Sequence, residues 1–465
     1  MKEEIRQYFL EHREDILKDI ASLVEINSVR DEAKEGMPFG EGPAKAVAEA
    51  KRIAERMGFA TKNFDNYALT INSDPSCQDA HLGILCHLDV VPEGTGWTRE
   101  PFKMTVEGDN IYGRGVSDDK GPAVTALWAL KACNDLGVKL SKNVRIILGS
   151  DEECGSSDLD YYFKKEAQPD FCFSPDADFP IYNCEKGRFS TTIRGKYENK
   201  ELPALVSFEG GHTSNIVAQH AEALVEGISL SDAKDAAKKW GEATKTEIEA
   251  NEDNGKVKFI CNGLSAHAST PRHGINAVTA LLQLLADLNL KGDLGKYIEG
   301  LSKLFPHGDF LGEAIGIKRE DEISGPLTCS FNILNIADGN LAGIFDIRSP
   351  ICSNEENTSL VMEKNLAKYS LTLDSTKMVE PHYVDENLPF IKILSKSYED
   401  FTGKKGECRS MGGGTYVHHI ENGVAFGPTM PGTETNIHGP DEVASVNELL
   451  LGAMIYTEVI IDMCK

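Results

Sequence analysis

Several classes of protein are excluded by what the sequence lacks. No stretch approaches the roughly 18 uninterrupted apolar residues of a membrane span. Residues 1–20 have the pattern of a charged amphipathic helix, without the apolar core and cleavage site of a signal peptide. Basic residues are in deficit, with 48 lysines and arginines against 73 acidic residues and a formal net charge of −25. Phosphate contacts need a basic surface, so we expect neither a nucleic acid nor a membrane as a partner.

Paired cysteines are also missing. The 11 cysteines are an odd number, and no two of them form a C-x-x-C pair. Several lie inside apolar segments, as Cys86, Cys172 and Cys329 do, which is typical of buried thiols. A disulfide framework is unusual in a chain this long, so we expect a reducing, cytoplasmic location. The sequence also has no low-complexity segment and no repeat of fixed period.

The first part of the chain alternates strand and helix patterns. At roughly 100–200 residues per domain, 465 residues predict two or three domains. Strand patterns occupy 81–92, 143–153 and 169–180, and helix patterns occupy 46–59 and 121–137. This alternation predicts an α/β sheet that is covered by helices on both faces.

The pattern changes after about residue 185. We expect a strand at 187–196, a strand that runs into a loop at 255–270, helices at 214–228 and 276–288, and paired strands at 327–336 and 341–350. Such a mixture indicates an α+β domain. The alternating strand and helix patterns of the first part then return, with a strand at 423–430 and a helix at 445–463. We therefore predict a discontinuous domain, 1–184 with 383–465, that is interrupted by a second domain at 185–382.

Polar side chains with metal-binding potential follow the apolar strands of the first domain. They are His87 and Asp89, Glu152 and Glu153, Asp176 and His438, with Asp118 and Asp119 in a glycine-flanked turn. Ligand sites in open α/β sheets gather at the carboxyl ends of strands. Imidazole and carboxylate without thiolate suit zinc or a similar divalent ion in a catalytic site. There are enough ligands for two ions, with one carboxylate bridging them.

Two pairs within this set have a particular geometry. His87 and Asp89 lie two apart on an extended segment and point the same way, so Asp89 can orient the histidine. Glu152 and Glu153 are neighbours and would point to opposite sides. One can bind metal while the other accepts a proton from a metal-activated water. The alternative is a solvated turn with acids at its tip.

The motifs resemble those of the di-zinc M20 metallopeptidases over nearly the full length. The matching segments are HLDVVP, GRGVSDDKGP, DEECGSSD, SPDADFP, GLSAHASTPRHGINA and IHGPDE. Further segments are similar to the bacterial PepV-type dipeptidase branch: GFATKNFDNYA, GDFLGEAIGI, DEISGPLT and MGGGTYVHH. The resemblance implies a catalytic domain of the zinc exopeptidase type, with a mixed sheet flanked by helices, interrupted by an α+β lid domain.

The resemblance also assigns roles to the residues after the strands. His87 and Asp176 would hold one zinc ion, Glu153 and His438 the other, and Asp118 would bridge them. Mn or Co could substitute for Zn. The peptide bond between Asp118 and Asp119 is cis in relatives. Asp89 would orient His87, and Glu152 would act as general base and then as general acid.

The lid domain, 185–382, would contribute residues that act on the substrate. By resemblance, His267 would stabilise the oxyanion, and Arg348 would bind the carboxylate of the substrate because its planar fork suits a carboxylate. Asn215 and Gly414 would be further substrate contacts. In the PepV branch one chain builds the whole site, so a monomer suffices. His418 and His419 depart from the family pattern, and their roles stay open.

The resulting hypothesis is a cytoplasmic metal-dependent dipeptidase that cleaves unmodified dipeptides with a zinc-activated water. A related alternative is an M20-type amidohydrolase of N-acyl or N-succinyl amino acids. A different class of alternative is a non-catalytic, metal-binding paralogue. The expected partner is a small peptide substrate.

Overall fold

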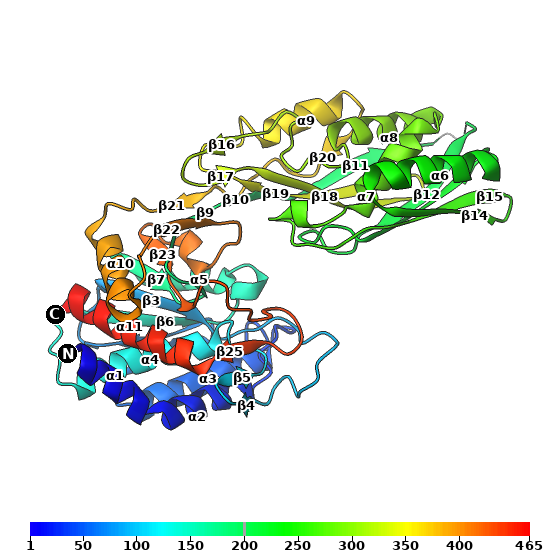
Figure 1. Ribbon diagram of the computed structural model, residues 1–465. Helices are drawn as coiled ribbons and strands as arrows, with labels where there is room; N and C mark the ends of the chain where they lie inside the picture. Colours follow the sequence, from blue (N-terminus) through cyan, green and yellow to red (C-terminus); the bar gives the residue numbers. More distant parts are fainter. Residues whose placement is uncertain (199–200) are drawn as a thin grey trace. The chain divides into compact units, whose positions relative to one another are not determined.

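The computed structural model describes residues 1–198 and 201–465, and this part of the chain divides into two compact units. Unit 1 comprises Met1–Cys184, Tyr383–Arg409 and Gly414–Lys465. Unit 2 comprises Glu185–His382 and Ser410–Gly413. The predicted insertion covers 185–382, and unit 2 includes the short segment Ser410–Gly413 in addition. Figure 1 shows the elements of each unit.

A mixed sheet forms the centre of unit 1. Its strands run in the order β1-β2-β6-β3-β7-β23-β9-β21, and β22 (Cys408–Met411) pairs with β9. Strands β6, β3, β7 and β23 are parallel neighbours, and β1, β2 and β9 pair antiparallel. The bounds are β1 (Thr61–Phe64), β2 (Ala68–Asn72), β3 (Leu82–His87), β6 (Val144–Gly149), β7 (Phe171–Ser174), β9 (Ile181–Glu185), β21 (His382–Tyr383) and β23 (Gly423–Ala425).

Apolar side chains of this sheet are buried on both faces, because successive residues of a strand point to opposite sides. In β3, Ile84 and Cys86 belong to the large core, whereas Leu85 packs in a smaller core with Tyr416. The large core is lined by α1 (Lys2–Glu11), α2 (Arg13–Val24), α3 (Glu41–Arg56), α4 (Lys120–Asp135), α10 (Pro389–Thr402) and α11 (Val446–Cys464). The smaller core is covered by α5 (Ser157–Tyr162) and η3 (Tyr416–His419).

A small sheet in unit 1 joins segments that are distant in the sequence. It contains β25 (Val443–Ser445), β5 (Asn110–Tyr112) and β4 (Thr105–Glu107), in that order. Val443 lies opposite Tyr112. The turn after β5 therefore lies beside the segment that precedes β25. The remaining short elements are β8 (Ala177–Asp178), which pairs with β24 (Pro428–Thr429), and η1 (Glu152–Cys154).

Unit 2 is an antiparallel sheet with helices packed on its core. The strand order is β14-β15-β13-β12-β18-β19-β11-β20, and β10 pairs with β19. The strands are β10 (Gly187–Phe189), β11 (Thr192–Lys196), β12 (Ala204–Gly210), β13 (His220–Glu226), β14 (Glu247–Asp253), β15 (Lys256–Asn262), β18 (Thr328–Ala337), β19 (Asn340–Ser349) and β20 (Thr372–Leu373). The other elements are α6 (Leu230–Thr244), η2 (Pro271–His273), α7 (Ala277–Asp287), α8 (Gly292–Leu304), α9 (Ser359–Ala367) and the pair β16 (Glu320–Asp321) and β17 (Gly325–Pro326).

The predicted fold class, an α/β domain interrupted by an α+β domain, is confirmed. One predicted helix is wrong: 214–228 contains β13 instead. Its buried residues Ala221, Ala223 and Val225 recur at every second position, which is the period of a half-buried strand. The single strand predicted at 187–196 is two strands, β10 and β11. The N-terminal helix pattern is divided at His12 into α1 and α2.

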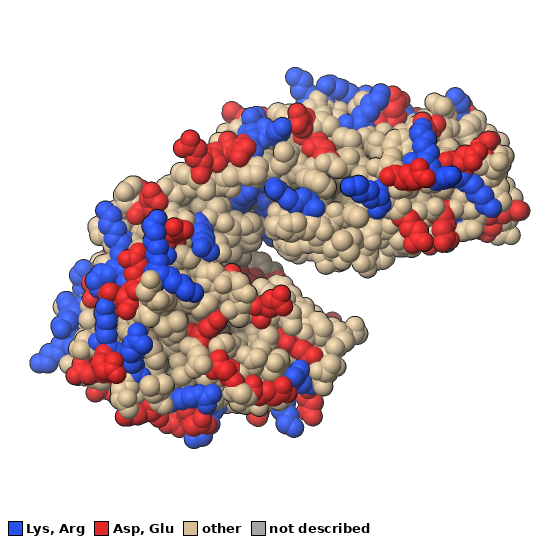
Figure 2. Space-filling model, in the orientation of Figure 1, with Lys and Arg blue, Asp and Glu red and all other residues tan. Residues whose placement is uncertain are grey.

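None of the helices in the described ranges has both the length and the hydrophobicity to cross a bilayer. On the face shown in Figure 2, basic and acidic side chains are interspersed over each unit. Cys86, Cys172 and Cys329 are buried thiols, as predicted.

Candidate metal centre

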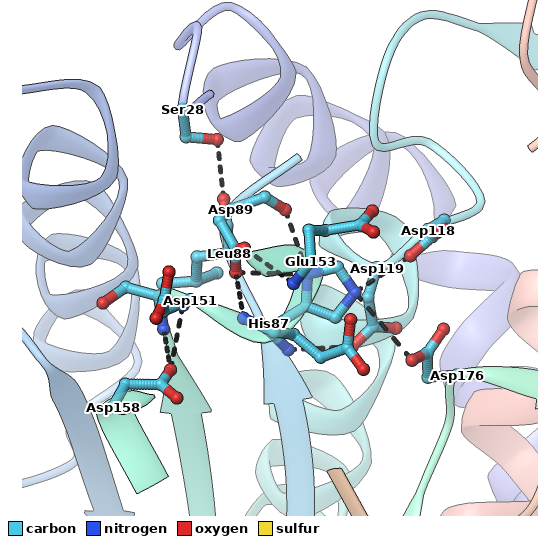
Figure 3. Close-up of polar contacts among 12 residues, drawn as sticks. Ser28, His87, Leu88, Asp89, Asp118, Asp119, Asp151, Glu153, Asp158 and Asp176 are labelled. Carbon is cyan, nitrogen blue, oxygen red and sulfur yellow. Dashed lines mark hydrogen bonds and ion pairs between the residues drawn. The ribbon is translucent and has the colours of Figure 1, made fainter. Parts of the chain in front are cut away.

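Three parallel strands of unit 1 deliver polar side chains to one edge of the sheet. His87 is the last residue of β3, Glu152 and Glu153 follow β6 in η1, and Asp176 follows β7. Because these strands are parallel, their carboxyl ends lie at the same edge. Asp118 comes from the turn after β5. Figure 3 shows His87 with Asp118, Asp119 and Asp176 on one side of its ring.

The predicted ligands lie close together. His87 Nε2 lies 2.9 Å from Asp118 Oδ1 and 3.9 Å from Asp176 Oδ2. His438 Nε2 lies 3.1 Å from Asp118 Oδ2 and 3.2 Å from Glu153 Oε1. The two oxygens of Asp118 therefore face two different histidines. This is the arrangement that a carboxylate bridging two cations requires.

These spacings fit divalent cations. Metal–ligand bonds of about 2.0–2.2 Å in a tetrahedral site put ligand atoms about 3.3 Å apart. His87, Asp118 and Glu153 offer atoms that all lie within 4.8 Å of one another, and so do His87, Glu152 and Asp176. Glu152, predicted as the general base, is thus also placed where a ligand could lie.

The charges of the site also fit a cation. Burial raises the pKa of Glu152, Glu153 and Asp176, and neighbouring carboxylates add to the shift. Burial would also raise the pKa of Asp118, but hydrogen bonds with His438 and His87 outweigh it and lower that pKa. Hydrogen bonds with Asp118 and Glu153 raise the pKa of His438 to about 10. Acids this crowded keep protons unless a positive charge replaces them, and divalent cations would supply that charge.

Asp89 organises both the histidine and the glutamate turn. His87 Nδ1 lies 3.0 Å from the carbonyl oxygen of Asp89 and 3.4 Å from its Oδ1. Donation from Nδ1 leaves Nε2 as the ligand atom. The Asp89 carboxylate accepts hydrogen bonds from the backbone N–H groups of Glu152 and Glu153, both at 3.1 Å. Asp89 thus fixes three predicted site residues at once.

Two residues that support this centre, Asp158 and Tyr416, were not predicted from the sequence. Asp158 accepts hydrogen bonds from the backbone N–H groups of Ser150 and Asp151, at 2.6 and 2.9 Å, and from the hydroxyl of Tyr416. The rings of Tyr416 and His87 are nearly perpendicular, with ring centres 6.2 Å apart. Both residues lie inside quoted motifs, but nothing in the spacing of those motifs indicates that the two are partners.

Asp119 also supports His87. Its Oδ2 accepts a hydrogen bond from the backbone N–H of His87 at 3.0 Å. Its Oδ1 is buried and has no hydrogen-bond partner among the described residues. The peptide bond between Asp118 and Asp119 is cis.

Two of the predicted substrate residues lie side by side in unit 2. His267 and Ile216 form an isolated β-bridge, and the backbone N–H of Ala268 donates to the carbonyl of Asn215 at 2.8 Å. The backbone N–H of Ser269 donates to His267 Nδ1 at 3.2 Å. In the neutral ring, the proton therefore lies on Nε2.

Arg348 is held rigidly within unit 2. Its Nε and Nη2 donate to the two carboxylate oxygens of Asp346 at 2.7 and 3.0 Å, and its Nη1 donates to the carbonyl of Gly412 at 2.6 Å. The bidentate face of the guanidinium is thus occupied by Asp346. Sequence reasoning had not singled out Asp346. Gly414, by contrast, belongs to unit 1 and is exposed.

The two histidines that depart from the family pattern lie on η3. His418 is half-buried and His419 is exposed. The carbonyl of His419 accepts a hydrogen bond from Gln168 Nε2 at 2.9 Å.

Together, the fold and the donor set define an α/β protein with a candidate metal centre, in which imidazole and carboxylate groups gather at the carboxyl ends of parallel strands, as in catalytic sites. The chain belongs to peptidase family M20/M25/M40, whose profile matches residues 83–462. The predicted M20 membership and the prediction of a peptidase are thereby confirmed.

Similar proteins support the same family. The chain is 37% identical over 459 residues to "Putative dipeptidase YtjP" of Bacillus subtilis (strain 168), covering 97% of this chain and 98% of that protein. It is 35% identical over 461 residues to the Beta-Ala-Xaa dipeptidase of Lactobacillus delbrueckii subsp. lactis, covering 97% and 96%. The structure of human carnosine dipeptidase 1 is similar in fold, with a TM-score of 0.61 at 15% identity over 99% and 98% of the two chains.

Proposed function

We propose that the chain is a dipeptidase that uses two divalent cations, Zn²⁺ in the first instance, to hydrolyse unmodified dipeptides. The observation that carries this proposal is the position of Asp118, whose two carboxylate oxygens face His87 and His438. The names of the relatives support the substrate class, because two of them are called dipeptidases and match the chain over almost its full length. We further propose a cytoplasmic monomer.

The distances within unit 1 support the ligand assignment that the resemblance implies. His87 and Asp176 would hold one cation, Glu153 and His438 the other, and Asp118 both. Mn²⁺ or Co²⁺ could replace Zn²⁺, because all five ligands are imidazole nitrogen or carboxylate oxygen.

When bound, such cations lower the pKa of a water molecule and polarise the scissile carbonyl. Glu152 would take the proton of the attacking water and deliver it to the leaving amine nitrogen. Burial raises the pKa of Glu152 above its usual value, which makes this carboxylate a better proton acceptor. Asp89 keeps Glu152 in place through the backbone N–H of Glu152.

The residues of unit 2 would act on the other groups of the substrate. His267 has its ring proton on Nε2 and would donate it as a hydrogen bond to the developing oxyanion. Arg348 carries a second N–H on each terminal nitrogen beyond its bonds to Asp346 and Gly412, and these would bind the substrate carboxylate. Asn215 and Gly414 would contribute further polar contacts to the substrate.

A panel of dipeptides tests the proposal. The protein is stripped of metal with a chelator, and hydrolysis is measured before and after addition of Zn²⁺, Mn²⁺ or Co²⁺. Each dipeptide is paired with its N-acetylated form, and the panel includes dipeptides with an N-terminal β-alanine. We expect metal-restored protein to prefer free dipeptides by roughly 10–100-fold, because a hydrogen bond to a charged amine contributes about 1.5–3 kcal/mol.

The other outcomes separate the alternatives. Preference for N-acetyl or N-succinyl substrates would identify an M20-type amidohydrolase instead. A protein that binds metal but cleaves no member of the panel would be a non-catalytic paralogue.

A further inference from the structure

Three loops that carry proposed ligands meet at one buried ion pair, Arg114 and Glu442. The two side chains are 1% and 0% exposed, and Arg114 Nη1 donates to Glu442 Oε2 at 2.8 Å. We infer that this pair is a positioning device that sets the distances between the ligands on these loops. The inference rests on the proposed metal centre and extends it to two residues that touch neither ligand side chains nor substrate.

Glu442 fixes the turn that carries Asp118. Because Val443 pairs with Tyr112, Glu442 lies opposite Gly113, whose backbone N–H donates to the carbonyl of Glu442 at 3.1 Å. The Glu442 carboxylate then accepts hydrogen bonds from three backbone N–H groups of the turn. The backbone N–H of Gly115 lies 3.0 Å from Oε2, and those of Ser117 and Asp118 lie 2.9 and 3.1 Å from Oε1. The backbone of the bridging residue is therefore bound directly to Glu442.

Arg114 joins this turn to the other two loops. Its Nη2 lies 3.1 Å from the carbonyl oxygen of Gly439, which follows His438 directly. The same nitrogen lies 3.4 and 3.3 Å from the carbonyl oxygens of Pro92 and Glu93, on the segment that follows His87 and Asp89. The guanidinium also lies 5.2 Å from the centre of the Trp97 ring, which covers it.

The turn is closely packed at Gly115. Gly115 has a φ of +90°, and a Cβ at this position would lie 2.9 Å from Lys120 Cδ and 3.1 Å from Val90 Cγ1. A shift of the Asp118 backbone would break the bonds to Glu442, and a shift of the His438 loop would break the bond from Arg114 to Gly439. Buried ion pairs often add little net stability over apolar residues, but they can fix one geometry. Here the ion pair fixes the distances that separate His87, Asp118 and His438 from one another.

Glu442→Gln tests the inference. The side chain keeps its shape, but one acceptor oxygen becomes an NH₂ group that opposes the backbone N–H donors of the turn. Zn²⁺ affinity is measured by competition with a chelator, and the visible spectrum of the Co²⁺-loaded protein reports ligand geometry. We expect Zn²⁺ to bind roughly 10–100-fold more weakly, as is typical for partners of metal-bound residues, and the Co²⁺ bands to change. Arg114→Lys, which keeps the charge but loses the planar fork, should change both readouts in the same direction.

Asp19→Asn provides a matched control in the same unit. Asp19 is 2% exposed and accepts hydrogen bonds from Arg56 Nη2 at 2.6 Å and Trp128 Nε1 at 3.0 Å. It is a buried acid paired with an arginine, but it belongs to α2, and these two partners belong to α3 and α4. The control should lower the melting temperature and leave the Zn²⁺ affinity and the Co²⁺ spectrum unchanged.

The outcomes separate this inference from the proposed function. If the wild-type protein and Glu442→Gln bind Zn²⁺ equally, within about threefold and thus below the expected 10–100-fold range, with the same Co²⁺ spectrum, the inference is wrong and the proposed function stands. If Glu442→Gln does not fold, Arg114→Lys decides by the same criterion. If the wild-type protein binds no divalent cation tightly, both the inference and the proposed function are wrong.

Discussion

Glu152 and Glu153 are adjacent in the sequence but have different neighbours. Glu153 Oε1 lies 3.2 Å from His438 Nε2, whereas the carboxylate of Glu152 groups with His87 and Asp176. Their backbones are held by the same carboxylate, that of Asp89. A single turn thus presents two acids to two parts of the site. The structure leaves Glu152 two chemical options, base or ligand, and these options predict different mutant behaviour.

Glu152→Gln separates the base from the ligand. If Glu152 is the base, the variant should bind two Zn²⁺ per chain as the wild type does and lose roughly 10²–10⁴-fold in kcat on dipeptides. Metal content by elemental analysis and steady-state kinetics are measured on the same sample. Glu153→Gln is the matched control and should lose metal as well as activity. Loss of metal from Glu152→Gln would instead make Glu152 a ligand.

Arg348→Met is expected to weaken substrate binding through the carboxylate end. The variant loses the N–H groups proposed for the substrate carboxylate, so KM for dipeptides should rise by roughly 10–100-fold, in line with about 1.5–3 kcal/mol for a charged hydrogen bond. Dipeptide amides lack the carboxylate and should show little change between the two proteins. Asp346→Asn, which removes one charge from the partner of Arg348, should have a smaller effect of the same kind. An equal rise in KM for acids and amides would contradict the proposed role.

At the scale of elements, strands that end in polar residues were the most predictable feature. The apolar runs before His87, Glu152 and Asp176 indicated strands of one sheet, and their parallel pairing brings these ends together. Asp118 and His438 directly follow no strand of that sheet. They are candidates by residue type and position in the sequence, whereas their roles as bridge and ligand come from the resemblance. The roles of Arg114 and Glu442 could not be predicted, because their partners are mostly backbone groups, which leave no pattern in a sequence.

The wrong helix at 214–228 has a comparable cause. Its alanines and valines suit a helix as well as a strand by composition, and their alternation extends over only a few residues. The segment forms a strand because β13 pairs with both β12 and β15, which provides backbone hydrogen bonds on both sides. Such pairing depends on residues far along the chain, which local periodicity does not report.

Three helices of unit 2 are connected through His307, and this connection should depend on pH. His307 follows α8; its Nδ1 lies 3.0 Å from Thr279 Oγ1 of α7, and its Nε2 lies 3.1 Å from the carbonyl oxygen of Thr244 in α6. Burial lowers the pKa of His307 below its usual value of 6.5, against the opposing effect of hydrogen bonds to backbone groups. The folded state therefore binds this proton less readily than the unfolded chain. Its stability should fall as the pH drops from above 6.5 through the lowered pKa.

Urea unfolding at several values between pH 5 and 8 measures this dependence. His307→Gln should lose stability at all pH values but show a weaker decline toward acid than the wild type. His273→Gln is the matched control, since the side chain of His273 is exposed and belongs to the same unit. An unchanged acid slope in His307→Gln would contradict the prediction.

At the scale of the whole molecule, removal of metal should destabilise unit 1. The site gathers buried carboxylates whose pKa values are raised by burial and mutual repulsion, and bound cations would relieve that repulsion. A ligand present at 1,000 times its Kd stabilises the folded state by about 4 kcal/mol. We expect the melting temperature in calorimetry to fall on treatment with a chelator and to recover with Zn²⁺. Chelator already saturated with Zn²⁺ should cause no change, and identical melting curves with and without metal would contradict the prediction.

Unit 1 is built from both ends of the chain, with nearly all of unit 2 between its parts. During synthesis on the ribosome, the first 184 residues emerge without β23, without α11 and without His438. A nascent chain that has already completed 185–382 still lacks one proposed ligand and the C-terminal helix of the large core. The proposed metal centre therefore cannot be complete before His438 has been synthesised, so a shorter nascent chain would lack the full set of proposed ligands.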